Sequence, residues 1–316
     1  IQPNNLMLEE MKSIYALDPA AEYLDVLLVR EINKYEQAGQ NYYPADAVNQ
    51  NSFKDGSAAL KAFIAKAIGE GKIKNKPLWT LALGYCDYLA GKPQEARKTF
   101  AQLPAASQTP EVKRQIETFD LMIQLREVQK LDATTEERLY QAVTKTKSES
   151  LKSLLVAVFK DLYKKQGEKA KEFLSDSEWY SFRMKATGPL VEQLLAFADK
   201  PSKTTYENEL LNKLKMDKAS PKEVLLEMKA TFLLKDDKLD EAEKIFSALT
   251  YKTDDIQGNA ADEQIKDCHE CAENSDKRFS KLQLIGQLKS LKKQAAGTDK
   301  VQAAEATYRL GNVYYN

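Results

Sequence analysis

The sequence contains few of the residues that build disulfide scaffolds, metal sites and tight turns. Among its 316 residues there are 3 cysteines, 1 histidine, 12 glycines and 10 prolines. Three cysteines are too few for a fold held together by disulfides. Because glycine and proline are both less frequent than in an average globular protein, we expect long helices and short turns rather than a β-sandwich.

The chain also lacks an excess of charge of either sign. It carries 47 basic and 47 acidic residues, and only 8 of the basic residues are arginine. Nucleic-acid-binding surfaces depend on a basic surplus that neutralises phosphates, so the composition argues against a nucleic acid as partner. No apolar run approaches the ~20 residues that cross a bilayer, and we therefore expect no membrane span in this segment.

The first residue is Ile1 instead of methionine, and no secretory signal sequence follows it. We therefore expect the sequence to be a piece of a longer protein. Removal of an export signal and removal of a preceding domain would explain the start at Ile1 equally well. A bacterial extracytoplasmic or envelope location is favoured slightly over the cytoplasm.

Helical patterns dominate the sequence. In the segment 17–39, apolar residues recur at helical spacing after Asp18, a predicted N-cap, and before Gly39, a predicted helix end. Further predicted starts pair an N-cap hydroxyl with a proline or with a glutamate three residues later: Thr109 with Pro110, Thr134 with Glu137, and Ser220 with Pro221 and Glu223. Sustained strand-like alternation is not found. The predicted fold class is therefore all-α, with antiparallel helices.

Two segments of the chain have similar sequences, "LAGKPQEARKTFAQL" at 89–103 and "LKDDKLDEAEKIFSAL" at 234–249. A small alanine lets a neighbouring helix approach closely, and a phenylalanine one turn later fills the space between the helices. A glycine or aspartate before them suits a tight turn. The matched pairs are Gly91 and Asp237, Ala96 and Ala242, and Phe100 and Phe246.

This spacing resembles the tetratricopeptide repeat, a helix–turn–helix unit of about 34 residues. Leu83 and Gly84 stand where that family has a Leu-Gly pair in its first helix, and Ala230 keeps the small residue in the second segment. The stretch "YKKQGEKAKEFL", with Gly167, is a weaker match. An ordinary helical bundle with alanine and phenylalanine in its core is the alternative.

The last stretch, "AEATYRLGNVYY", also resembles the first helix of such a repeat, with Leu310 and Gly311 as the pair and Tyr314 as the aromatic residue that follows. We therefore expect the sequence to stop within a repeat. A break at 175–189 suggests two helical-repeat halves, residues 1–180 and 181–316. One continuous solenoid over 1–316 is the alternative.

The resemblance implies an α-solenoid of stacked, irregular helix pairs with a concave groove. Members of such a family commonly bind a peptide segment or a partner helix in that groove. The resemblance therefore implies recognition of a protein or peptide, without catalysis and without a cofactor. It does not identify which residues line the groove.

The motif "KDCHECAEN" places Cys268 and Cys271 on either side of His269, the single histidine. A structural zinc site needs about four ligands, and the sequence has neither a second cysteine pair nor a second histidine. On a helix, the two cysteines would share one face and pack as small apolar residues. We expect packing; a disulfide in an oxidising compartment and a redox or metal role are the alternatives.

Trp179 and Tyr180 lie in the motif "EWYSF" within the predicted break at 175–189. Aromatic side chains in a loop are candidates for contact with a partner or with a sugar ring. An extracytoplasmic protein that binds a glycan or small molecule through them is therefore the alternative function. Most of the 15 tyrosines are expected to pack between helices.

Signals of catalysis are weak throughout the sequence. The stretch "GEGKIK" at 69–74 lacks both the glycine spacing and the Ser or Thr after lysine of a phosphate-binding loop. No nucleophile-elbow motif accompanies His269. We expect no enzyme activity. The predicted function is a non-enzymatic scaffold that binds a protein or peptide in its groove.

Overall fold

The computed structural model describes residues 6–39, 47–176, 179–216, 218–251, 256–261 and 278–315, without the side chains at 36–39, 47–56, 179–180, 257 and 278. Regular structure in these ranges is helical apart from one antiparallel pair of two-residue strands, β1 (Ile256–Gln257) and β2 (Arg278–Phe279). The all-α fold class predicted from the sequence is confirmed.

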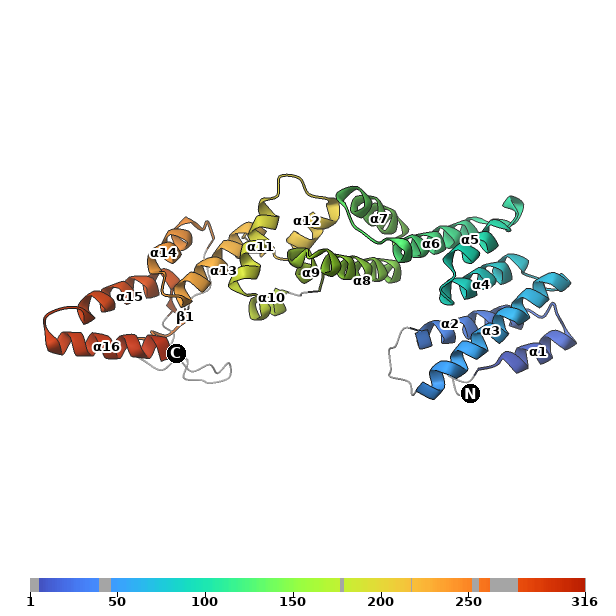
Figure 1. Ribbon diagram of the computed structural model, residues 1–316, viewed down its shortest axis with the longest axis horizontal. Coiled ribbons are helices and arrows are strands. Elements are labelled where there is room, and N and C mark those ends of the chain that lie inside the picture. Colours follow the sequence, from blue (N-terminus) through green and yellow to red (C-terminus); the bar gives the residue numbers. More distant parts are fainter. Residues whose placement is uncertain are drawn as a thin grey trace. The chain divides into compact units, whose positions relative to one another are not determined.

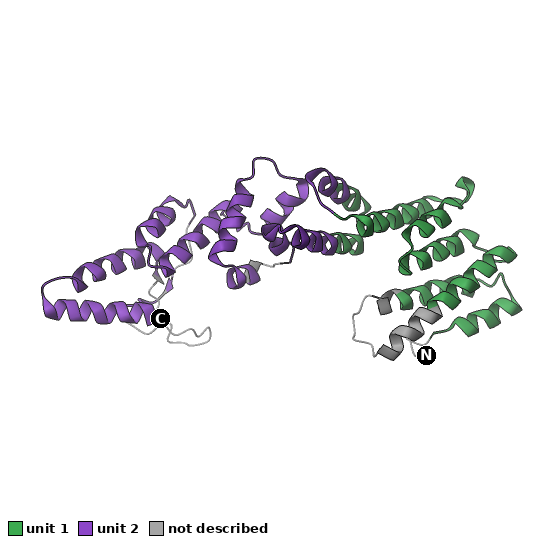
Figure 2. Ribbon diagram, in the orientation of Figure 1, with its two compact units in different colours: residues 1–129, 141–155 green, residues 130–140, 156–316 purple. Residues whose placement is uncertain are grey.

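The chain forms two compact units (Figure 2). Unit 1 comprises residues 1–129 and 141–155, and unit 2 comprises residues 130–140 and 156–316. The boundary falls within two helices, α7 (Ala133–Thr146) and α8 (Glu149–Gln166). The division at residue 180 that the sequence suggests stays a prediction.

The remaining helices follow one another along the chain (Figure 1). Those of unit 1 are α1 (Leu8–Leu17), α2 (Tyr23–Gly39), α3 (Ala47–Glu70), α4 (Lys76–Leu89), α5 (Pro93–Ala101), the 3-10 helix η1 (Ala105–Ser107) and α6 (Pro110–Glu127). Those of unit 2 are α9 (Lys169–Asp176), α10 (Trp179–Lys185), α11 (Gly188–Asp199), α12 (Thr205–Asn212), α13 (Pro221–Lys235), α14 (Leu239–Ala248), α15 (Lys281–Ala295) and α16 (Lys300–Tyr315).

In the described chain, the same turn joins α4 to α5, α8 to α9 and α13 to α14. Each turn has a residue with positive φ: Gly91 at 74°, Gly167 at 75° and Asp237 at 62°. The next N–H donates to the carbonyl five residues earlier, at 2.9 Å in each case: Lys92 to Asp87, Glu168 to Tyr163, and Lys238 to Leu233. This is the Schellman arrangement, after which the chain enters the next helix immediately. The resulting neighbouring pairs are compatible with a helical repeat.

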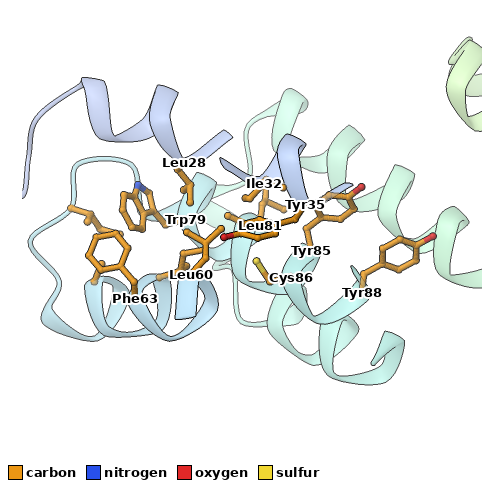
Figure 3. Close-up of a cluster of buried hydrophobic side chains, with 14 of the residues drawn as sticks. Leu28, Ile32, Tyr35, Leu60, Phe63, Trp79, Leu81, Tyr85, Cys86 and Tyr88 are labelled. Atoms are coloured by element: carbon orange, nitrogen blue, oxygen red, sulfur yellow. The ribbon is translucent and has the colours of Figure 1, made fainter. Parts of the chain in front are cut away.

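The core of unit 1 is built from the apolar faces of its helices (Figure 3). Trp79 is only 1% exposed; its ring packs edge-on against Phe63 at 5.8 Å between centroids, and its indole N–H donates to Asp25 at 2.8 Å. The indole thus buries its apolar surface while its polar group keeps a partner. Full burial of one large apolar side chain contributes about 1.5–3 kcal/mol, so this cluster fixes α2, α3 and α4 against one another.

In unit 2, the pair α13–α14 packs against α15. Ala230, Ala242 and Phe246 share one buried cluster with Ile285 and Leu288 of α15. Ala230 and Ala242 are fully buried, at 0% exposure. Because an alanine leaves room for close approach of a neighbouring helix, these positions hold the pair together as their spacing suggests.

Several helix starts agree with the sequence. Thr109 accepts a hydrogen bond from the N–H of Val112, and Ser220 forms a reciprocal capping box with Glu223. Each N-cap hydroxyl therefore satisfies an N–H group that has no acceptor within the helix. These two predictions are confirmed.

Three local predictions are wrong. Asp18 follows the end of α1, where its carboxylate accepts from the N–H of Ala20 at 2.9 Å, and α2 begins only at Tyr23. The Asp-Pro dipeptide thus forms a turn.

Asp132, not Thr134, caps α7, because it accepts from the N–H of Thr135 at 2.7 Å. The residues from Trp179 onward form helix α10 where a loop was predicted.

None of the described helices combines the length and the apolar character that a membrane span requires.

Candidate functional site

A groove with a volume of about 660 Å³ opens on unit 1. Its lining comes from α2, α4, α6 and the first turn or two of α8, that is, from every second helix along the chain. The groove therefore lies along the face that these alternate helices form within unit 1.

One face of α4 runs the length of the groove. Its lining residues are Leu78, Leu81, Ala82, Tyr85, Tyr88 and Leu89. They recur at helical spacing and extend for about 16 Å at the usual rise per residue. Gly84 lies on a different face of α4, where a Cβ atom would be 2.2 Å from Cε1 of Phe100 in α5. Helix α4 thus packs on α5 through one face and lines the groove with another.

Stacked aromatic rings form part of the groove. The ring of Tyr85 is 4.9 Å from that of Phe119 in α6 and 5.7 Å from that of Tyr88, and both pairs are nearly parallel. Phe119 in turn stacks on Phe100 at 5.1 Å. Figure 3 shows Tyr35, Tyr85 and Tyr88 at one end of the cluster, away from Phe63 and Trp79. These rings are at most 9% exposed, so their stacking forms a rigid floor beneath the groove.

Arg126, near the end of α6, supplies charge to this surface. Its guanidinium carbon lies 3.9 Å from the centroid of the Tyr88 ring, and Nη1 donates to the Tyr88 carbonyl oxygen at 3.0 Å. The cation–π contact and the hydrogen bond together restrict the rotamers of a long side chain. Arg126 is nevertheless exposed, so its guanidinium is held in place at the edge of the groove.

The Tyr35 phenol and the Cys86 thiol stay uncharged at neutral pH. Burial raises the pKa of the Tyr35 phenol to about 12, and the charge of Glu31 adds to the effect. Burial likewise raises the pKa of the Cys86 thiol to about 12, with a contribution from Asp87. Cys86 is thus an unreactive core residue, and the charge of the groove is that of Arg126.

The residues of the predicted repeat signature lie outside the groove lining. Buried members are Gly84, Ala96, Phe100, Ala230, Ala242 and Phe246. Leu83 and Leu310 are partly buried, and Gly91 forms its turn. Gly311 and Tyr314 are exposed on α16, and the Tyr314 hydroxyl donates to Asp237 at 3.0 Å.

The other sequence candidates are not tested. Cys268, His269 and Cys271 lie outside the described residues. Trp179 and Tyr180 begin α10, but their side chains also lie outside the described set. The metal, disulfide and glycan alternatives therefore stay predictions. Among the described residues, no group of three His, Cys, Asp or Glu side chains could hold a metal ion.

Buried carboxylates that the sequence did not reveal lie in unit 2. Glu136 of α7 and Glu207 of α12 are each 1% exposed. Glu136 accepts from the Tyr163 hydroxyl at 2.5 Å and from the hydroxyl of Thr204, the N-cap of α12. Lys171 of α9 lies 3.5 Å from Glu136 and 3.1 Å from Glu207. One ionic network thus joins α7, α8, α9 and α12.

Lys200 completes the network around Glu207. Its ammonium contacts both carboxylate oxygens, at 2.8 and 2.9 Å, and the N–H of Thr204 donates to Oε2 at 3.0 Å. Burial alone would raise the pKa of Glu207, but Lys200, the Thr204 amide and Lys171 lower it below the ordinary value of 4.5. Because these donors surround the carboxylate, its environment is that of a charged residue that stabilises the fold, and not that of a group that transfers protons.

A third buried carboxylate, Glu227 of α13, has a similar environment. Arg183 of α10 and the Tyr251 hydroxyl each donate to Oε2 at 3.1 Å, and Lys281 of α15 donates to Oε1. Glu227 thus links α10, α13 and α15. Each partner comes from a different part of the sequence, which is why spacing alone could not identify the cluster.

A polar hollow of about 700 Å³ lies in unit 2 near the starts of α7 and α12. Its Glu137 carboxylate accepts from the N–H and the hydroxyl of Thr205, at 2.6 and 2.7 Å. The carboxylate therefore already occupies the N-terminal end of α12. The groove of unit 1 remains the better candidate site, because its lining is mainly apolar and is ordered by stacked rings.

In the comparisons with known proteins, no protein-family model, curated protein or solved structure matches the chain.

Proposed function

We propose that this chain is a non-enzymatic scaffold that binds a segment of another protein in the groove of unit 1. In this proposal the helix pairs are irregular repeats resembling tetratricopeptide repeats, stacked as an α-solenoid. The shared turn at Gly91, Gly167 and Asp237 supports the repeat. The proposal concerns recognition, and its binding surface is defined by residues of α2, α4, α6 and α8.

The observation that carries the proposal is the groove lining. Rings and aliphatic side chains from alternate helices form one apolar surface along about three turns of α4. Apolar grooves of this kind accept the alternate side chains of an extended segment or one face of a helix. Tyr35, Tyr85 and Tyr88 are at most 8% exposed, so they support the floor of the groove, and the more exposed lining residues such as Val29 supply the contact area. Binding a polypeptide would cover apolar surface that water now contacts.

Selection from a displayed library of random linear peptides tests the proposal with the intact chain. We expect peptides rich in apolar and aromatic residues, with saturable binding to the purified protein. Val29 of α2 lines the groove and is 43% exposed, so Val29→Glu introduces charge without replacing a core residue. We expect this variant to lose peptide binding.

Val26→Glu is the matched control, because Val26 lies on the same helix, is 69% exposed and does not line the groove. This variant should bind the selected peptides as the unchanged chain does. Circular dichroism and thermal unfolding check that both variants fold. Failure to select any saturable peptide, or equal loss of binding in both variants, would contradict the proposal.

A further inference from the structure

The groove combines an apolar lining with charge of one sign. Among the described residues that line it, Arg126 alone carries a charge, and no lining side chain is acidic. On α6, the acidic residues nearest to Arg126 in sequence pair with Arg97 of α5: Asp120 at 2.9 Å and Glu127 at 2.7 Å. The carboxylate next to Arg126 in sequence therefore serves the α5–α6 contact.

The guanidinium of Arg126 is oriented for a further partner. Its contact with the Tyr88 ring and its bond to the Tyr88 carbonyl oxygen hold the group at the edge of the groove. A guanidinium has five N–H donors in a planar fork, and the bond to Tyr88 uses one of them. The fork matches a carboxylate, and a bound segment that excludes water would strengthen the pair.

We propose that the segment recognised by the groove carries an aspartate or glutamate side chain beside its apolar residues, and that this carboxylate pairs with Arg126. The inference rests on the function proposed above and specifies its partner as an acidic, apolar protein segment. Because the lining follows several turns of α4, side chains along the segment supply most of the contact. We therefore assign the carboxylate to a side chain and not to a chain end.

The test uses peptides selected on the unchanged chain, synthesised with acetylated and amidated ends so that no terminal charge remains. Each acidic peptide is paired with the analogue in which glutamine replaces the glutamate. Fluorescence anisotropy measures both peptides on the full chain. We expect the analogue to bind about tenfold more weakly, the usual effect of losing a charge-assisted hydrogen bond, and the difference to shrink at high salt.

Variants of the chain assign this effect to one side chain. On Arg126→Gln the two peptides should bind alike, whereas Arg126→Lys should keep part of the preference because it keeps the charge. Arg114→Gln is the control, since Arg114 lies on the same helix, is exposed and does not line the groove. It should preserve the full preference.

The outcomes separate this inference from the function on which it rests. If peptides bind the groove but show no acidic preference, or if the preference persists in Arg126→Gln, the inference is overturned while the proposed function stands. If binding requires a free terminal carboxylate, the assignment to a side chain is overturned. If no peptide binds, both proposals fail.

Discussion

At the scale of single residues, Gly84 and Gly311 occupy the same place in the predicted repeat but have different surroundings. A Cβ atom on Gly84 would lie 2.2 Å from the Phe100 ring, whereas one on Gly311 would meet nothing within 4 Å. Close packing therefore requires a glycine at position 84 but not at position 311. The sequence could identify both as Leu-Gly pairs, but it could not show which one is covered, because that depends on the neighbouring helix.

The comparison predicts opposite effects of the same substitution. Gly84→Ala should lower the free energy of unfolding by about 1–2 kcal/mol, because overpacking against Phe100 outweighs the gain in helix propensity. Gly311→Ala should leave it unchanged or raise it by up to about 1 kcal/mol. Urea unfolding followed by circular dichroism measures both. Two variants that shift in the same direction by the same amount would be inconsistent with this assignment.

At the scale of helices, starts and turns could be predicted where the signal is local. The hydroxyls of Thr109 and Ser220 cap their helices because each cap involves only the next few residues. Asp18 shows the limit of such reasoning: an aspartate before proline suits a helix start and a turn equally well. Here the residues before Asp18 already form the last turn of α1, so Asp18 lies at a helix end, where the chain turns.

Contacts between helices could not be predicted from the sequence, because they depend on residues that are far apart in it. Among 47 acidic residues, Glu136 has no local feature that distinguishes it from solvated glutamates, and the capping-box spacing of Glu207 from Thr204 indicates a helix start and not burial. Their burial depends on Lys171 of α9 and on Lys200, the residue that follows α11. A buried carboxylate is tolerated only with such partners, so the partners have to be known before the burial can be inferred.

The Glu207 network predicts a stability effect and its pH dependence. Glu207→Gln should cost about 2–4 kcal/mol at neutral pH, because it leaves Lys171, whose side chain is only 13% exposed, without one of its carboxylates. The pKa of Glu207 is lower in the folded chain than its ordinary value of 4.5. Its contribution is therefore complete above that value and is lost as the pH falls through the lower, folded pKa. Urea unfolding between neutral and acidic pH should show a shallower acid-side decline for the variant.

The control for this experiment is Glu192→Gln. Glu192 forms a surface ion pair with Lys229, at 2.8 Å, and its side chain is 55% exposed. Exposed pairs contribute about 0–1 kcal/mol, so this variant should remain close to the unchanged chain at every pH. Equal losses in the two variants would show that Glu207 does not act as a buried ion.

At the scale of the whole molecule, the all-α fold class could be predicted from composition and helical periodicity, whereas the groove could not. Its lining combines Val29, Tyr85, Met122 and Leu154 from helices far apart in the sequence. No spacing rule relates such positions, and none of the residues of the predicted repeat signature lines the groove. The predicted aromatic site at Trp179 lies in unit 2, away in sequence from every lining residue.

Photo-cross-linking of a selected peptide tests most directly whether the groove of unit 1 holds a polypeptide segment. Benzoylphenylalanine replaces Gln115, an exposed residue of the lining, or Glu117, an exposed residue of the same helix outside it. If the groove holds the segment, we expect a covalent adduct, located by mass spectrometry, from position 115 and little from position 117. Equal adducts from both positions, or an adduct from position 117 alone, would contradict the proposal.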